Sequence, residues 1–375
     1  MACRSDNSLS QGMKQRGSAE ALFLLSDGNL HHSNHTGEYK TMRKITGRVR
    51  SLAAALAIGL LSSALAHAAD AIPTTPEAGS FKLGIEPWLG YGQWDIADSK
   101  GLFKANGLSD VQIVNFSEDK DINAALASGQ LDAANIATHT AMGMVAAGLP
   151  VKIVLLLDVS MTADAIIAGK DVNTIADLKG KQVAFEEGTT SDILLKYALA
   201  KNGMTVADIQ PVPMPAADAG SALIAGKVPV AVTYEPYLTA AKAQNKDIKL
   251  IFSAGIDPGL ISDVLVVRDD VIKSRPGQVL AMIKSWDAAL SAYKADTPGG
   301  RAIIAKAVGS NVDDLNTAFD GVRYYSLAEN KDALTGDFST KTFADVEAAA
   351  KNAKLLQSDV TPEQMIDPSF VKAAQ

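Results

Sequence analysis

Cysteine and histidine are almost missing from this 375-residue chain, which contains one Cys and five His. Cys3 and four of the histidines lie within the first 68 residues, so only His139 remains in the rest of the sequence. Residues 69–375 therefore cannot form a disulfide or supply a cysteine nucleophile, and they offer too few ligands for a usual zinc site. We predict no catalytic residue, no bound metal and no cofactor.

Nucleotide-binding motifs and excess positive charge are also missing. The chain has neither a GxxxxGK[ST] phosphate loop nor a GxGxxG turn, and GYGQW at 90–94 supplies only two of the three glycines. From residue 69 onward, 27 Lys and Arg stand against 38 Asp and Glu, a formal charge of −11. An acidic chain of this kind is a poor partner for nucleic acid or anionic lipid, so we predict no nucleic-acid partner.

The N-terminal region has the features of an export signal. Four basic residues between positions 43 and 50 precede an apolar run at 52–65, which is followed by Ala66-His67-Ala68. This order predicts a signal peptide, removal of residues 1–68 and a periplasmic location for the rest of the chain. A membrane anchor is disfavoured because the run is shorter than the roughly 20 residues that span a bilayer. Translation from Met42 instead of Met1 would place the basic residues at the front, where signal peptides normally have them.

Short apolar strands alternate with helical stretches in two consecutive sets, at 81–157 and 181–254. The second set repeats part of the first, because DINAALASGQLDAANIATHT (121–140) aligns with DAGSALIAGKVPVAVTYEPY (218–237) at an offset of 97, with Gly129 on Gly226 and Ala134 on Ala231. Such alternation favours α/β units whose parallel sheets are covered on both faces. The pattern predicts two similar α/β lobes.

The same pattern predicts how the lobes divide. We expect residues 69–164 and 265–375 to form one lobe and residues 165–264 the other, with segments 158–170 and 257–268 as the connections. Open α/β sheets bind ligands beyond the carboxyl ends of their strands. Two such lobes would enclose a cleft that closes on a small molecule by hinge motion.

Five segments carry a family resemblance: EPWLGYGQWDIADSKGLFKANGL, NAALASGQLDAAN, ADLKGKQVAFEEGTTS, ALIAGKVPVAVTYEPYL and DVLVVRDDVI. In this order they resemble the periplasmic substrate-binding proteins of the nitrate, sulfonate and taurine class of ABC importers. The resemblance implies a type II periplasmic-binding-protein fold with a ligand cleft between two lobes. It also implies a monomer that delivers a small solute to a membrane permease and its ATPase subunits.

The resemblance leaves the solute open, because relatives carry nitrate, bicarbonate, sulfonates, pyrimidines and other small molecules. The loops expected at the cleft contain no Lys or Arg but nine carboxylates: Glu86, Asp158, Asp164, Glu186, Glu187, Asp192, Asp218, Glu235 and Asp263. Carboxylates and aromatic faces favour a cationic or donor-rich solute of the guanidine, amidine or amine type. Nitrate, taurine or an alkanesulfonate, held by hydroxyls and helix N-termini, is the alternative.

Eleven residues are the predicted ligand contacts: Glu86, Trp88, Tyr91, Thr138, His139, Asp158, Thr189, Thr190, Tyr234, Glu235 and Asp263. Glu235 is the strongest of them, because the buried strand VPVAV delivers it to a strand end followed by Pro236. For Trp88 and His139, a purely structural role is equally open. Helix capping is the preferred reading of Asp121 and Asp218, and a place in the core is preferred for Trp94.

An enzyme on the same fold is the alternative of a different class. Pyrimidine-synthesising proteins of this fold depend on a cysteine-rich motif and additional histidines, which this chain lacks after residue 68. Export and the lack of nucleophiles favour a binding protein without chemistry.

Overall fold

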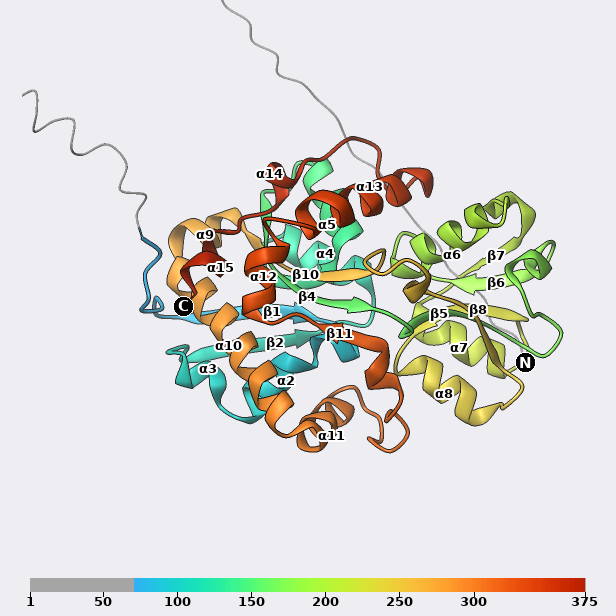
Figure 1. Ribbon diagram of the computed structural model, residues 1–375, viewed down its shortest axis with the longest axis horizontal. Coiled ribbons are helices and arrows are strands. Elements are labelled where there is room, and N and C mark those ends of the chain that lie inside the picture. Colours follow the sequence, from blue (N-terminus) through green and yellow to red (C-terminus); the bar gives the residue numbers. More distant parts are fainter. Residues whose placement is uncertain (1–70, 375) are drawn as a thin grey trace, which may run out of the picture. The chain divides into compact units, whose positions relative to one another are not determined.

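The computed structural model describes residues 71–374, whose strands form two separate sheets (Figure 1). The strand order is β11-β4-β10-β3-β1-β2 in the first sheet and β7-β6-β8-β5-β9 in the second. The first sheet contains β1 (Ser80–Ile85), β2 (Asp110–Asn115), β3 (Ala133–Ala137), β4 (Val151–Ser160), β10 (Ser262–Arg268) and β11 (Val322–Tyr324). The second contains β5 (Asp164–Ala168), β6 (Gln182–Phe185), β7 (Gln210–Pro213), β8 (Val230–Tyr234) and β9 (Lys249–Ser253).

Both sheets are mixed, which corrects the expectation of parallel sheets. In the first sheet β1 pairs in parallel with β2 and β3, whereas β10 is antiparallel to β3 and β4. In the second sheet β6 pairs in parallel with β7 and β8, whereas β5 is antiparallel to β8 and β9. The antiparallel strands β5 and β10 lie in the two segments expected to be simple connections. Each segment therefore adds a strand to a sheet as the chain passes from one sheet to the other.

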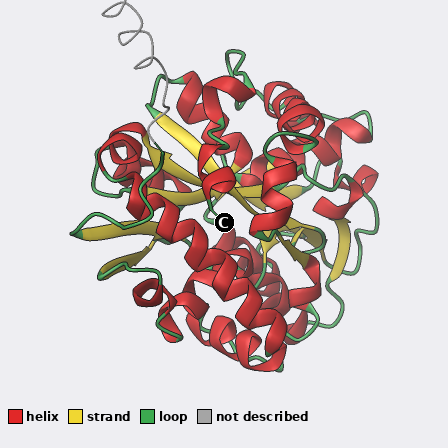
Figure 2. Cartoon of the chain, turned by 60° about the vertical axis from the view of Figure 1, so that its left-hand side comes forward, coloured by secondary structure: helices red, strands yellow, loops and turns green. Residues whose placement is uncertain are grey.

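Helices cover both faces of each sheet, with the strands between them (Figure 2). The helices beside the first sheet are α2 (Gly92–Ser99), α3 (Leu102–Ala105), α4 (Asp119–Ala127), α5 (Thr138–Ala146), α9 (Asp269–Ser274), α10 (Pro276–Ala295), α11 (Thr297–Ala307), α12 (Leu327–Ala333), α13 (Phe343–Asn352), α14 (Pro362–Met365) and α15 (Ser369–Ala373). Those beside the second are α6 (Thr190–Lys201), α7 (Ala216–Ile224) and α8 (Tyr237–Gln244).

The hydrophobic core beside the first sheet is built where α10 packs on α2, α3 and α11. Trp94 of α2 is fully buried there, 5.0 Å from the ring of Trp286 and stacked at 6.3 Å on Phe103, which confirms it as a core residue. On the other side, α13 packs against both α5 and α6, so it touches helices of both sheets. None of the helices between residues 71 and 374 is long and apolar enough to cross a membrane.

The stretch GQWDIADSKGLFKANG (92–107) has a helical pattern that predicts one helix, but it forms two, α2 and α3, separated at Gly101, whose φ of 68° lies in the left-handed region that favours glycine. The sequence offers Thr190 or Ser191 as the cap of the helix that begins near residue 190. The observed N-cap of α6 is Thr189, whose hydroxyl accepts from the backbone N–H of Ser191. The lobe division at residues 164 and 264 remains our proposal, and β5 and β10 begin close to those positions, at Asp164 and Ser262.

Candidate functional site

A small cavity lies where the ends of strands from both sheets meet. Its lining comes from the segment after β1, the start of α4, the start of β5, the turn between β6 and α6, the end of β8 and the start of β10. The lining residues are Glu86, Trp88, Tyr91, Asp119, Asp164, Glu186, Thr189, Thr190, Ser191, Tyr234, Ile261 and Asp263. Because β5 and β10 run antiparallel to their neighbours, their first residues reach the edge at which β1 and β8 end. That geometry brings carboxylates to one place from distant parts of the sequence.

The cavity is narrow and strongly acidic. It leaves about 30 Å³ for the centres of water-sized molecules, room for only a few waters. Five of its twelve lining residues are Asp or Glu, and no Lys, Arg or His from the described part of the chain lines it. The space therefore admits only a solute of few atoms.

Aromatic rings form one wall of the cavity. Trp88 and Tyr91 are 6% and 5% exposed, and the rings of Trp88 and Tyr234 meet edge to face with centroids 5.8 Å apart. The indole Nε1 of Trp88 donates to Oδ1 of Asp158 at 3.2 Å. This hydrogen bond holds the Trp88 ring in place beside the acidic groups.

Burial dominates the electrostatics of the carboxyl groups. Desolvation raises the pKa of Asp164 to about 8, and it raises the pKa values of Asp158 and Glu186 to about 7. The pKa values of Glu86 and Asp263 lie well above the usual range, first through desolvation and then through neighbouring carboxylates. Each of these shifts favours the protonated, neutral form of the carboxyl group.

Seven of the eleven predicted contacts line this cavity: Glu86, Trp88, Tyr91, Thr189, Thr190, Tyr234 and Asp263. Asp158 is fully buried and does not line the cavity, but it accepts a hydrogen bond from Trp88, which does. Thr138 is buried and donates to the carbonyl of Ser262 at 3.0 Å, so it supports the start of β10. His139 is 4% exposed, and desolvation lowers its pKa to about 4, so its imidazole is neutral at physiological pH.

Glu235, the strongest sequence candidate, is not part of the cavity lining. Its Oε2 accepts from the backbone N–H of Thr239 and its Oε1 from the Thr239 hydroxyl, both at 3.0 Å, at the start of α8. The side chain lines a separate surface depression together with Lys242. Neighbouring residues of a strand point to opposite faces, so Tyr234 faces the cavity and Glu235 faces away from it.

Five lining residues were not among the eleven: Asp119, Asp164, Glu186, Ser191 and Ile261. Asp164 and Glu186 belong to the nine cleft carboxylates noted in the sequence, but nothing there separated them from Glu187 and Asp192. Those two border another depression, where Asp192 pairs with Lys196 at 2.8 Å. Asp119 is the first residue of α4, which follows β2, and the repeat offset of 97 places it on Ala216, the first residue of α7. A carboxylate at the start of a helix that follows a strand end is the signal that could have identified it.

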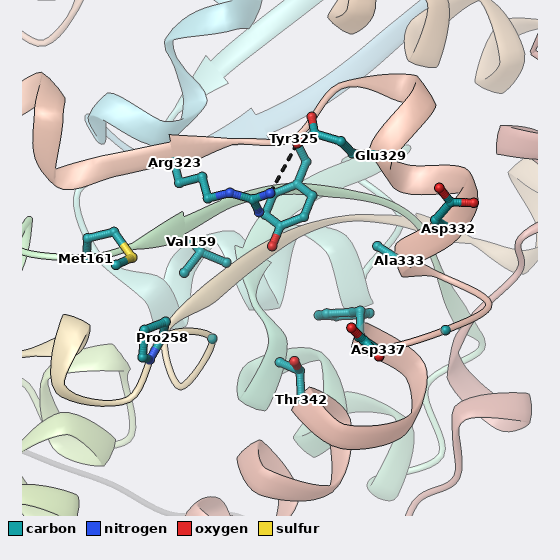
Figure 3. A pocket seen from close by; sticks show the side chains of 13 residues that line it. Val159, Met161, Pro258, Arg323, Tyr325, Glu329, Asp332, Ala333, Asp337 and Thr342 are labelled. Atoms are coloured by element: carbon teal, nitrogen blue, oxygen red, sulfur yellow. Dashed lines mark hydrogen bonds and ion pairs between the residues drawn. The ribbon is translucent and has the colours of Figure 1, made fainter.

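A larger cavity of about 680 Å³ lies along the segments that pass between the sheets and beside α12 (Figure 3). Arg323 lies over the ring of Tyr325 at 3.9 Å and pairs with Glu329 at 3.1 Å. The side chains of this ion pair are 48% and 41% exposed, so the charges are solvated and already matched. The smaller acidic cavity is the better candidate site, because carboxyl groups and aromatic rings from both sheets converge on it.

The fold is that of a type II periplasmic binding protein. The chain belongs to the NMT1/THI5-like family, whose model matches residues 95–297. A protein of Brucella abortus (strain 2308) named as a binding protein is 28% identical over 266 residues, 70% of this chain and 72% of the relative. The taurine-binding periplasmic protein of Escherichia coli (strain K12) is 23% identical over 247 residues, 64% of this chain and 77% of the relative.

Solved structures share this fold. The alkanesulfonate-binding protein SsuA from Xanthomonas axonopodis pv. citri, bound to MOPS, superposes with a TM-score of 0.65 at 19% identity, over 77% of this chain and 98% of that protein. The expected two-lobed fold and the resemblance to the nitrate, sulfonate and taurine class are confirmed. Within residues 71–374 no group of three or more His, Cys, Asp or Glu is arranged to hold a metal ion.

Proposed function

We propose that this chain is the periplasmic solute-binding component of an ABC importer, that it performs no catalysis, and that it binds a small nitrogen-rich cation or donor-rich solute. The role in transport is supported by the family, by relatives named as binding proteins and by the shared fold. The solute class rests on one observation: a small cavity with five carboxyl groups, three aromatic rings and no basic side chain among the residues described.

Energetics favour a planar cation over an anion. A hydrogen bond to a charged group contributes about 1.5 to 3 kcal/mol, and a cation over an aromatic face contributes about 0.5 to 2 kcal/mol. Three or four such contacts reach the roughly 8 kcal/mol of micromolar binding. The rings of Trp88 and Tyr234 and the carboxyls of Glu86 and Asp263 line the same small space, so one guanidinium-sized solute would touch both kinds of group.

An anion such as nitrate, or the sulfonate of taurine, would depend on the N-terminus of α6. The Thr189 hydroxyl there is already engaged, because it donates to the carbonyl of Glu186 at 3.0 Å and accepts from Ser191 N–H at 3.3 Å. The hydroxyls of Thr190 and Ser191 remain as donors, beside the carboxyl of Glu186. The relatives named for taurine and alkanesulfonate favour this anionic alternative. Among these solutes the zwitterion taurine fits the cavity best, because its amine can bind a carboxylate of the lining.

Its partners would be the membrane permease and the ATPase subunits of the importer, with the binding protein acting as a monomer. In this proposal Glu86, Trp88, Tyr91, Tyr234 and Asp263 contact the solute. Asp158 positions Trp88, and closure of the two lobes around the cavity hides the solute from water.

A thermal-shift screen tests the solute class directly. Guanidinium, methylammonium, urea, taurine, ethanesulfonate and nitrate are each added at low millimolar concentration, and a bound solute stabilises the protein by RT ln(1 + [L]/Kd). We expect guanidinium or methylammonium to raise the melting temperature. Stabilisation by nitrate or ethanesulfonate, with no effect of any cation, would contradict the proposal.

Two variants test whether Asp263 contacts the solute in this screen. Asp263→Asn keeps the shape of a cavity carboxyl and removes its charge, so the shift produced by a cation should shrink. Asp218→Asn is the matched control, because Asp218 is an exposed residue in the first turn of α7. If both variants respond to the cation like the unaltered protein, Asp263 is not a ligand contact.

A further inference from the structure

Two pairs of carboxyl groups lie together at the cavity. Glu86 and Asp119 both line it, and Asp263 is paired with Asp158 across the neighbouring strands β10 and β4. An ionised carboxylate only accepts hydrogen bonds, so two carboxyl groups can bond to each other only when one of them carries a proton. Each pair brings together residues that are 33 or 105 positions apart in the sequence.

Two buried carboxyl oxygens without a hydrogen-bond donor also indicate a proton shared within each pair. Oε1 of Glu86 and Oδ2 of Asp158 are buried, and no donor group from residues 71–374 reaches either of them. At Asp158 the space is tight, because a Cβ added at Gly90 would lie 2.3 Å from Oδ2. A buried oxygen without a donor costs about 1 to 3 kcal/mol. A proton shared within each pair supplies the missing donor.

The groups that face the two pairs do not offer a compensating positive charge. Around Glu86 and Asp119 they are Glu186, Tyr91, Tyr234, Tyr237 and Asp263, and around Asp158 and Asp263 they are Trp88, Tyr91, Tyr324, Asp164 and Asp119. His139, at the start of α5, is neutral. The pKa values of Glu86 and Asp263 lie well above the usual range for this reason and because of burial.

We propose that each pair holds one proton in the solute-free protein and that a cationic solute takes the place of these protons, so that binding is an exchange of a cation for protons. This inference rests on the proposed solute class and adds the regulation of the same site. In the exchange, the O–H bond at Glu86 or Asp263 breaks, the proton passes to the buffer, and an N–H of the solute becomes the donor to the carboxylate.

Such exchange makes affinity depend on pH. For each proton released, the apparent Kd falls about tenfold for every unit by which the pH rises, as long as the pair is protonated when empty. With two pairs, a plot of log Kd against pH should have a slope between about 1 and 2 in magnitude near neutrality. The protein would then bind its solute more tightly in neutral than in acid medium.

Isothermal titration calorimetry counts the protons. Guanidinium and methylammonium chloride are each titrated at the same neutral pH in phosphate and in Tris, which differ in ionisation enthalpy. The dependence of the binding enthalpy on the buffer gives the number of protons released. We expect between one and two for the unaltered protein and for Asp218→Asn. For Asp263→Asn we expect the release of about one proton fewer. We expect the same reduction for Asp119→Asn, which tests the pair of Glu86 and Asp119. Binding of a cation without release of protons would overturn the exchange.

A second measurement needs no solute and separates the two proposals. Infrared spectra of the solute-free protein at neutral pH should show the carbonyl stretch of buried protonated carboxyl groups, and this band should weaken in Asp263→Asn and in Asp119→Asn. Absence of the band overturns the shared protons even if a cation binds. Presence of the band with no binding of either cation supports the protonated pairs, while the exchange and the cationic solute class both fall.

Discussion

Replacing Trp88 with Phe tests whether the aromatic wall of the cavity is held by a carboxyl that titrates near neutrality. The change keeps a ring at this position and removes the Nε1–H that donates to Oδ1 of Asp158 at 3.2 Å. Both partners are buried, at 6% and 0% exposure, so water cannot replace the lost donor. The free energy of unfolding should therefore fall by about 1 kcal/mol if Asp158 is neutral and by about 1.5 to 3 kcal/mol if it is ionised.

The pH dependence is the distinctive part of this prediction. Desolvation raises the pKa of Asp158 to about 7, and the hydrogen bond from Trp88 holds it lower than it would otherwise be. A raised native pKa means that the group's contribution to stability is complete below its unfolded pKa of 3.8 and is lost as pH rises through about 7. In Trp88→Phe that pKa rises further, so the loss continues to higher pH. The destabilisation should be smaller near pH 5 and larger near pH 9.

Urea unfolding followed by circular dichroism at the two pH values provides the measurement. Trp286→Phe is the matched control, because its Nε1 donates to the backbone carbonyl of Tyr325 at 2.9 Å, a group that does not titrate. Both variants lose similar ring volume from buried sites. An equal pH trend in the two variants, or none in Trp88→Phe, would refute the role assigned to Asp158.

Three further changes test separate contacts. Glu235→Ala should lower stability by about 0.5 to 2 kcal/mol through loss of its two hydrogen bonds from Thr239, yet leave solute affinity measured by calorimetry unchanged, and a large loss of affinity would return Glu235 to the site. Desolvation raises the pKa of Asp164 to about 8, so the unaltered protein loses stability as pH rises from about 4 towards 8. Asp164→Asn avoids that loss and should be the more stable form in urea above pH 8; lower stability there would contradict its burial as an acid. Gly90→Ala places a Cβ 2.3 Å from Oδ2 of Asp158 and should cost about 1 to 3 kcal/mol in thermal unfolding, whereas Gly143→Ala in α5 meets nothing within 4 Å and should be neutral or stabilising.

The sequence by itself determined the local elements and the sign of the charge at the site. The stretches FKLGIE (81–86) and VPVAVTYE (228–235), followed by turn and cap residues, became β1 and β8, because periodicity and capping act within a few residues. The lack of Lys and Arg in the loops at strand ends is a property of composition, and it persists in the cavity that these loops form.

Strand pairing was decided by tertiary structure. Segments 158–170 and 257–268 contain short apolar runs that the sequence does not assign to either sheet, and these runs form β5 and β10. A strand is defined by its partner, and the partners of β10 are β3 and β4, more than one hundred residues earlier. Pairing at that distance leaves no local mark in a single sequence.

Which way each carboxyl group points, and how far its pKa is shifted, were also decided only by the fold. Tyr234 and Glu235 are adjacent, and the alternation of a strand sends one to the cavity and the other to the cap of α8, but the sequence does not say which face is the cavity. Asp119 became a site residue because the start of α4 lies beside the end of β1 in space. The pairing of Glu86 with Asp119, and of Asp158 with Asp263, depends on burial and on distances of a few Å between remote residues. Those quantities set the pKa values, and they exist only once the chain has folded.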